Sequence, residues 1–331
     1  MIRQDLSLKA SSPNLFDDLI GQPLAACLLQ AALEQGRLAP AYLFTGPDGV
    51  GRRLAALRFL EGVLSTEMNP ISSSRQRRRL RDRNHPDLLW VEPTYMHQGR
   101  TVPISAAGDE VGLRRRLPPQ LRLEQIREVT RFLARQSIEC SRGLVVIEGA
   151  ERMNESAANA LLKTLEEPRH GLLLLLTCMP DLLPSTIRSR CQHIPFRRLR
   201  PEAMDQVLNP KAGSKQQENS IELLAMAAGS PGALIEHRRR FEEIPYQIRS
   251  RLNSLPISAL EALSLARELS ESLDTEQQLW LISWWQQHLW LQQESTVVLR
   301  RLDKLQKNIL ALVQPRLAWE VALLDLINTP D

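Results

Sequence analysis

Short apolar runs alternate with helical segments through the first 200 residues, and this pattern constrains the fold more than any other feature. The apolar runs are residues 42–45, 87–91, 144–147 and 172–177. Segments with helical spacing of apolar residues accompany them at 22–35, 52–64, 123–133 and 155–165. Continuous apolar runs separated by helices are typical of parallel strands buried on both faces. The sequence therefore predicts an α/β domain in which helices cover both faces of a parallel sheet.

Two polar stretches interrupt this order and are predicted to be loops or excursions from the sheet. Residues 98–119 are rich in glycine and arginine, and residues 69–84 carry a cluster of arginines. The cluster consists of Arg75, Arg77, Arg78, Arg79, Arg81 and Arg83. It could bind phosphates, but it lacks interleaved aromatic residues for base stacking. A solvated, disordered loop is the favoured interpretation.

The second half of the chain is predicted to be helical throughout. Strand signals stop at about residue 200, and the motif Gly-Ser-Pro-Gly at 229–232 interrupts the helical pattern. Five of the six tryptophans follow, at Trp280, Trp284, Trp285, Trp290 and Trp319. The apolar segment 279–291 predicts either the core of a helical domain or an interface with other subunits, and the two can coexist. We predict three domains, at residues 1–198, 199–238 and 239–331.

Composition and charge narrow the class of protein. The chain has 331 residues, too many for one ordinary core, and a net charge of +4 that permits nucleic-acid contact without requiring it. Its four cysteines form no metal-binding spacing, which predicts free thiols in a reducing compartment. The first residues lack the apolar core of a signal peptide, and no apolar run is long enough to span a membrane. We expect a cytoplasmic protein without membrane contact.

A glycine-rich turn at residues 46–51 is the first candidate for chemistry. Gly46 and Gly51 have the spacing of a P-loop between a strand and a helix, with Gly49 between them. The next residues are Arg52 and Arg53, where a P-loop has lysine and then serine or threonine. Arg52 could touch a phosphate, but the hydroxyl that holds Mg²⁺ is missing. We therefore predict a degenerate, non-functional P-loop.

The end of the predicted strand 144–147 is the second candidate. An ATPase places an acidic residue here for the metal, often followed by a glutamate that activates water. Glu148 stands at the metal position, but Gly149 occupies the position of the catalytic glutamate and cannot act as a base. A second part of the ATPase machinery is therefore missing. An α/β domain that never bound nucleotide would explain this too, although the retained glycine pattern argues against it.

The third candidate is the segment Ser189-Arg190-Cys191. An isolated arginine is most often a solvated surface charge, so the context decides its interpretation. A nucleophilic role for the serine or the cysteine is not expected, because no base is suggested nearby in the sequence.

Four motifs, separated along the chain, occur in the same order and spacing as in one known protein family. They are FDDLIGQ (16–22), AYLFTGPDGVGR (41–52), NALLKTLEEP (159–168) and STIRSRCQ (185–192). Together they resemble the clamp-loader branch of the AAA+ family, over about residues 14–235. The resemblance implies an AAA+ core domain, a helical lid and an all-α collar domain. The degenerate nucleotide site resembles the site of the non-hydrolysing member of this branch more than the site of the ATP-hydrolysing gamma/tau subunit.

The resemblance also implies a role and partners. Arg190 would act as an arginine finger on ATP bound by a neighbouring gamma/tau-type subunit, with Ser189 and Cys191 positioning it. The chain itself would have no ATPase activity and no cofactor. Its partners would be gamma/tau and delta subunits, with the sliding clamp and primed DNA reached through the complex. Two alternatives stay open: an active DNA-dependent ATPase, and a DNA-binding adapter outside replication.

Three departures from the family pattern matter. Many relatives carry four cysteines that form a zinc module, but this chain has no cysteine between Cys27 and Cys140, so no zinc is expected. Ala233 and Leu234 follow the segment that resembles the start of the sensor-2 helix, and no arginine there could sense nucleotide. Thr177 matches the sensor-1 region and is predicted to be structural.

Overall fold

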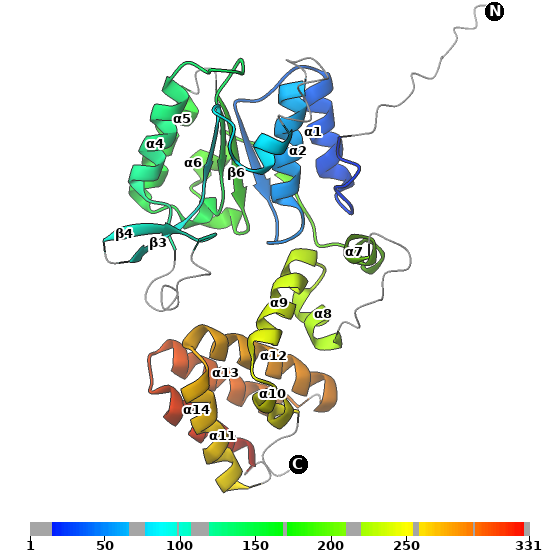
Figure 1. Ribbon diagram of the computed structural model, residues 1–331, viewed down its shortest axis with the longest axis vertical. Helices are drawn as coiled ribbons and strands as arrows, with labels where there is room; N and C mark the ends of the chain where they lie inside the picture. Colours follow the sequence, from blue (N-terminus) through cyan, green and yellow to red (C-terminus); the bar gives the residue numbers. More distant parts are fainter. Residues whose placement is uncertain are drawn as a thin grey trace, which may run out of the picture. The chain divides into compact units, whose positions relative to one another are not determined.

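The computed structural model describes residues 15–65, 77–97, 99–106, 119–167, 171–209, 220–253, 258–293 and 295–327. The chain separates into two compact units, which divide in sequence at about residue 210 (Figure 1). Helix α7 (Pro201–Leu208) groups with the first unit. The predicted boundary between lid and collar, at residues 238 and 239, falls inside the second unit and stays a prediction.

A five-stranded parallel sheet forms the centre of the first unit, as the sequence pattern predicted. Its strands lie in the order β2 (Leu88–Val91), β5 (Leu144–Ile147), β6 (Leu172–Thr177), β1 (Ala41–Thr45) and β7 (Gln192–Pro195). Strand β6 pairs with β1 in a register that sets Ala41 beside Leu173. Because the strands are parallel, their carboxyl ends meet at one edge of the sheet, and the loops that follow β1, β5 and β6 share this edge.

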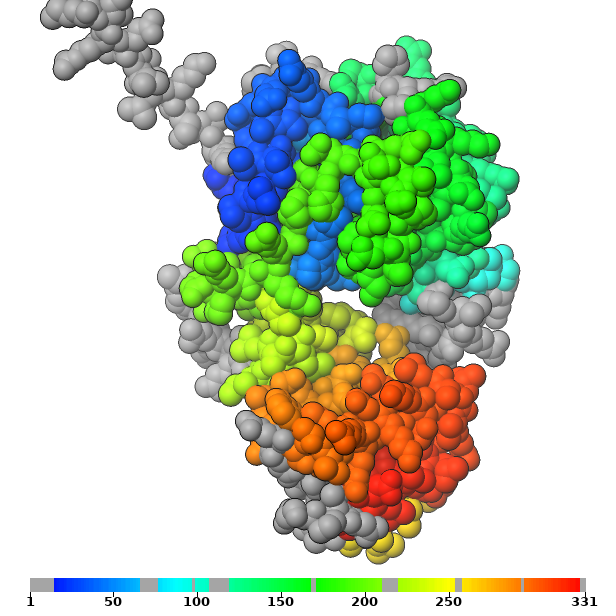
Figure 2. Space-filling model, turned by 180° about the vertical axis from the view of Figure 1, so that it is seen from behind, coloured from blue at the N-terminus to red at the C-terminus, as the bar shows by residue number. Residues whose placement is uncertain are grey.

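Helices cover both faces of this sheet. Helices α1 (Pro23–Glu34) and α2 (Arg52–Ser65) lie on one face, and α4 (Leu123–Ala134) and α5 (Glu155–Glu166) lie on the other (Figure 1). Alternate strand residues, such as Leu173 and Leu175, pack into the core beneath α4 and α5. In Figure 2 the green part of the chain that contains β7 lies beside the blue segment of α1, and these two elements are in contact.

A β-hairpin follows the first edge strand of the sheet. Strands β3 (Thr94–His97) and β4 (Arg100–Pro103) pair antiparallel, and Gly99 turns the chain with a φ of +77°. Of the two alternatives for 98–119, a loop or an excursion from the sheet, residues 100–103 form an excursion, while residues 98 and 107–118 lie outside the described residues. Short strands joined at a glycine are a hairpin signal, but the polar composition of this stretch obscured it.

The arginine-rich segment is also more ordered than expected. Residues 77–81 are helical, so the interpretation as a disordered loop is wrong for this part, while residues 69–76 lie outside the described residues. Arg79 donates a hydrogen bond to Glu139 at 2.6 Å, and Arg83 forms ion pairs with Glu92 and Glu148. These two side chains are therefore engaged with the chain itself.

The described part of the second unit is entirely helical, as predicted. Its helices are α8 (Ile221–Ala227), α9 (Pro231–Glu243), α10 (Tyr246–Leu252), α11 (Ala259–Ser272), α12 (Thr275–Gln293), α13 (Thr296–Leu310) and α14 (Pro315–Ile327). Helix α11 packs on α14, and α12 packs on α8 and α13. Helix α8 of the predicted lid is thus in contact with helix α12 of the predicted collar within one unit.

The tryptophans of this unit mostly form its core. Trp285 and Trp319 are fully buried with ring centroids 6.4 Å apart. Trp285 donates from its indole to the carbonyl of Leu252 at 2.9 Å, and Trp319 donates to Gln278 at 3.0 Å. Buried indoles with satisfied N–H groups are typical of a packed interior. The core interpretation is therefore confirmed for these rings, while Trp290 is 39% exposed.

Candidate functional site

The predicted P-loop follows β1 and leads into α2, as the motif requires. Gly46 has a φ of +150°, and a Cβ atom built on it would lie 2.5 Å from the carbonyl oxygen of Phe196. Gly49 and Gly51 have φ values of +75° and +105°. These conformations are strained for residues with a side chain. The backbone conformation of this turn therefore requires glycine at these three positions.

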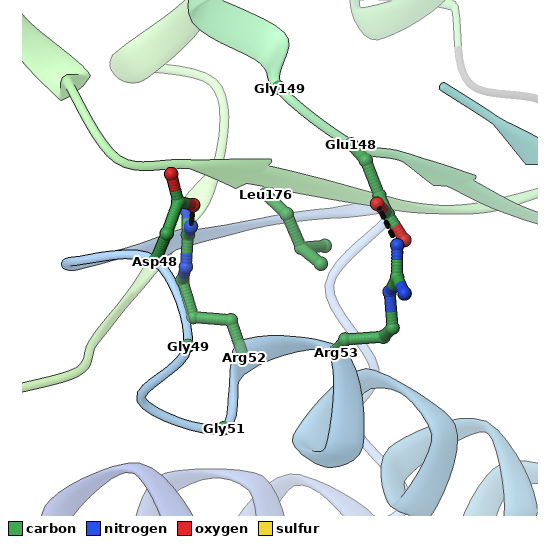
Figure 3. A pocket seen from close by; sticks show the side chains of 8 residues that line it. All are labelled: Asp48, Gly49, Gly51, Arg52, Arg53, Glu148, Gly149 and Leu176. Atoms are coloured by element: carbon green, nitrogen blue, oxygen red, sulfur yellow. Dashed lines mark hydrogen bonds and ion pairs between the residues drawn. The ribbon is translucent and has the colours of Figure 1, made fainter. Parts of the chain in front are cut away.

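A cavity of about 370 Å³ lies between this loop and the carboxyl ends of two central strands (Figure 3). Its lining residues are Asp48, Gly49, Gly51, Arg52, Arg53, Glu148, Gly149 and Leu176. The structure thus brings together the loop and the end of β5, which the sequence singled out separately. Gly46 supports the turn without lining the cavity.

Both P-loop arginines are engaged by carboxylates. Arg52 forms an ion pair with Asp48 across the loop, and the Arg52 side chain is only 10% exposed. Arg53 binds Glu148 through two parallel hydrogen bonds, Nε to Oε1 at 2.7 Å and Nη2 to Oε2 at 2.5 Å. These bonds raise the pKa of Arg53 above its ordinary value. Figure 3 shows the two pairs on opposite sides of the cavity, with Leu176 between them.

Glu148 also has partners outside the loop. Trp90 on β2 donates its indole N–H to Oε1 at 2.7 Å, and Arg83 lies 3.5 Å away in a further ion pair. The guanidinium of Arg83 stacks over the Trp90 ring at 4.6 Å from its centroid. Sequence reasoning missed these partners, because nothing in the spacing of residues 83, 90 and 148 links them. Asp48 and Arg52 are only four residues apart, but Asp48 lies in the turn before α2, so the helical i, i+4 rule did not predict their contact.

Two positions near the cavity lack the chemistry of a hydrolytic site. Gly149 has a φ of +59°, and a Cβ atom there would lie 2.8 Å from the Pro93 ring. A catalytic glutamate at this position would therefore meet both backbone strain and a steric clash. Thr177, at the end of β6, is fully buried, and its hydroxyl accepts a hydrogen bond from the Met179 backbone at 3.2 Å.

Arg190 lies apart from the cavity, in the segment after helix α6 (Ser185–Arg188). Its guanidinium donates to Glu166 Oε1 at 2.9 Å and to the carbonyl of Thr186 at 3.0 Å. The side chain keeps 37% of its surface exposed. Ser189 donates to the same Thr186 carbonyl at 3.2 Å.

Cys191 packs against the hydrophobic core of the first unit. Burial raises the pKa of its thiol to about 12, so the thiol carries no charge at neutral pH. A nucleophilic role for this cysteine is therefore disfavoured.

The start of helix α9 has no basic side chain that could reach a nucleotide. Ser230 caps the helix by accepting a hydrogen bond from the Ala233 backbone at 3.2 Å. The first arginine of α9 is Arg238, two turns further along the helix.

A second cluster, of His85, Asp87 and Cys140, holds possible metal ligands. The Asp87 backbone N–H donates to His85 Nδ1 at 3.1 Å, which puts the proton of the neutral imidazole on Nε2. Burial lowers the pKa of His85, so this ring is neutral at pH 7. The Nε2 atom faces Cys140 Sγ at 3.8 Å as an N–H group and is not free to bind a metal. The absence of zinc stays a prediction, and this geometry favours a structural cluster.

Asp87 is the centre of that cluster. Its carboxylate accepts three backbone hydrogen bonds, from Ile138 at 2.8 Å, Glu139 at 2.7 Å and Cys140 at 2.9 Å. Burial alone would raise the pKa of Asp87, but the three donors outweigh it and lower the pKa. A lowered folded pKa contributes stability above the ordinary pKa of aspartate, and this contribution is lost as the pH falls through the folded pKa.

We predict that Asp87→Ala lowers the free energy of unfolding by about 3 kcal/mol at pH 7, because three backbone donors lose their acceptor. Chemical denaturation followed by circular dichroism measures this change. Asp181→Ala is the matched control, since the Asp181 side chain is 92% exposed and forms one ion pair. The control should stay within about 0.5 kcal/mol of the parent. Equal losses in the two variants would contradict the structural role of Asp87.

The parallel sheet, its P-loop and the helical second unit define an AAA+-type protein. A family model described as DNA polymerase III, delta subunit, matches residues 21–200. A second, described as Cyanobacterial DNA polymerase III delta prime, C-terminal domain, matches residues 202–326. The chain belongs to the DNA polymerase III delta-prime family.

Individual relatives agree with this assignment. DNA polymerase III subunit delta' of Bacillus subtilis is 34% identical over 187 residues, 56% of this chain and 50% of the relative. The subunit delta' of Pseudomonas aeruginosa is 30% identical over 197 residues, 58% of this chain and 54% of the relative. The chain therefore spans about half the length of these curated relatives.

A solved structure shows a similar fold. The DNA polymerase III gamma subunit-related protein of Thermotoga maritima matches with a TM-score of 0.55 and 18% identity, over 92% of this chain and 98% of that chain. Among the described residues, no helix has the length and apolar character needed to cross a membrane.

Proposed function

We propose that this chain is a non-catalytic subunit of the DNA polymerase III clamp loader, and that it helps to load the sliding clamp onto primed DNA. One observation carries the proposal: Arg52 and Arg53 stand where an ATPase has its lysine and hydroxyl residue, and each is paired with a carboxylate. Glu148 presents both carboxylate oxygens to Arg53, and the hydroxyl that would hold Mg²⁺ beside a phosphate is absent at position 53. The family supports the setting, because its relatives include DNA polymerase III subunits delta' and tau.

The proposed positive role belongs to Arg190. Its two hydrogen bonds use two of the five N–H donors of a guanidinium. The exposed side chain can therefore bind a phosphate supplied by another molecule. An arginine provided in trans stabilises the charge that develops on the transferring phosphoryl group. In this proposal the acceptor is ATP bound by a neighbouring gamma/tau-type subunit, and gamma/tau and delta subunits are the direct partners.

We predict that the isolated chain hydrolyses ATP at less than about 1 s⁻¹, the low end for typical enzymes. The reason is the loss of both the metal-binding hydroxyl and the water-activating carboxylate. Arg52→Lys should not restore turnover, since Arg53 and Gly149 are unchanged in that variant. A coupled assay of phosphate release, with and without primed DNA, measures the rate. Turnover well above this limit would instead support the alternative of an active DNA-dependent ATPase.

A further inference from the structure

The cavity at the degenerate P-loop has the space for a ligand. Its volume of about 370 Å³ lies within the range of about 300–1,000 Å³ that is usual for small-molecule pockets. In Figure 3 the Asp48–Arg52 pair and the Arg53–Glu148 pair lie on opposite sides of the cavity, with the Leu176 side chain between them. Lack of room therefore does not explain why such a site would be unused.

The loop also retains the backbone donors of a phosphate site. Within the described part of the chain, the N–H groups of Gly49, Gly51 and Arg52 meet no hydrogen-bond acceptor. They stand at the N-terminus of α2, a helix of 14 residues, where backbone N–H groups and the helix dipole favour an anion. These donors and the cavity together are the features of a P-loop that survive here.

The charges of the cavity, in contrast, are already balanced. Two guanidinium groups and two carboxylates line it, so the formal charges cancel. A carboxylate presents two oxygens to an arginine in the same forked geometry as a phosphate. Glu148 does this with Arg53 through both oxygens, and Asp48 engages the nine-tenths buried Arg52. Both arginines thus have their anionic partner within the chain.

We propose that Asp48 and Glu148 are built-in counter-ions that close this cavity to phosphate ligands by charge, not by shape. Their carboxylates occupy the arginines and repel a polyphosphate that would otherwise reach the free N–H groups of the loop. The latent ligand class is an inorganic or nucleotide polyphosphate without a metal ion. The proposal concerns the isolated chain and holds whether or not Arg190 acts on a neighbour.

The test is binding of inorganic pyrophosphate, without divalent metal, to the full-length chain by isothermal titration calorimetry. The double variant Asp48→Asn with Glu148→Gln keeps the shape of both side chains and removes both negative charges. It should bind pyrophosphate at least about tenfold more tightly than the parent, because two charge-assisted hydrogen bonds to the ligand become available. Adding Arg52→Gln and Arg53→Gln should abolish the gain.

Glu139→Gln is the matched control, because it neutralises the carboxylate of another arginine pair, with Arg79 at 2.6 Å, outside the cavity. It should leave pyrophosphate binding at the level of the parent. Asp48→Asn alone covers the case in which the double variant fails to fold, since the Asp48 side chain is 75% exposed. This single variant should show a smaller gain.

Two results would overturn the proposal. One is parent protein that binds pyrophosphate as tightly as the double variant. The other is a folded double variant, or a folded Asp48→Asn variant, without any gain in binding. Neither result bears on the proposed clamp-loader role, which is tested by assembly and by the ATPase rate of the complex.

Discussion

Replacing Arg190 by alanine is expected to lower the DNA- and clamp-stimulated ATPase rate of the assembled clamp loader, and clamp loading with it. A trans-acting arginine contributes about 10³ to 10⁵ in rate at the site that it serves. The loss in the whole complex should be smaller, because other ATP sites keep their own arginines. Folding and assembly should be nearly unchanged, since the side chain is 37% exposed and its ion pair with Glu166 lies at the surface.

Two further variants separate a finger from a simple positive charge. Arg190→Lys should rescue poorly, because an ammonium group cannot reproduce the two parallel hydrogen bonds of a guanidinium. Arg188→Ala is the neighbouring control, since Arg188 is paired with Asp181 at 3.0 Å and is expected to have a smaller effect. If complexes with Arg190→Ala hydrolyse ATP and load clamps at the parent rate, the contribution of this subunit is scaffolding alone.

Removing the second unit is expected to abolish assembly with partner subunits while the first unit remains folded. The boundary between lid and collar predicted from the sequence, at residues 238 and 239, lies within helix α9, so a cut there would split a helix. The structure moves the cut to about residue 210, where the two compact units divide. The first unit contains its own five-stranded sheet and core, which is the reason to expect independent folding.

Size-exclusion chromatography with gamma/tau-type subunits, together with circular dichroism of the truncated chain, measures both parts of this expectation. The full-length chain carrying Arg190→Ala is a suitable control, because it changes the proposed finger and keeps the helical unit. Co-elution of the truncated chain with its partners would show that the principal contact lies in the first unit.

The regular part of the fold was predictable because its signals are local. A strand such as Leu172–Thr177 is one continuous apolar run, and the P-loop turn is set by glycines at fixed spacing. The partners of Glu148 were not predictable, because Arg53 and Trp90 are 95 and 58 residues away and meet it only in the folded sheet. Composition misled in the arginine-rich segment, where ion pairs with distant carboxylates accompany a helix that the charge pattern alone did not favour.

The tryptophans show the same limit. The sequence predicted an apolar helical segment but left open whether its rings form a core or an interface. The hydrogen bond from Trp285 to Leu252, 33 residues earlier, places this ring in the core. This contact forms only when whole helices pack together. Burial of this kind depends on tertiary arrangement, so it cannot be read from the spacing along one helix.

The ion pair between Arg53 and Glu148 connects helix α2 to the segment that follows strand β5, and a bound nucleotide would bridge these two parts in an active P-loop protein. A bridge made by a ligand is present only while the ligand concentration exceeds its dissociation constant. The stability of the folded protein then depends on the concentration of that ligand. Here the bridging groups are part of the polypeptide, so their local concentration is fixed by the fold. The thermal stability of this chain should therefore be the same in nucleotide-rich and nucleotide-depleted conditions.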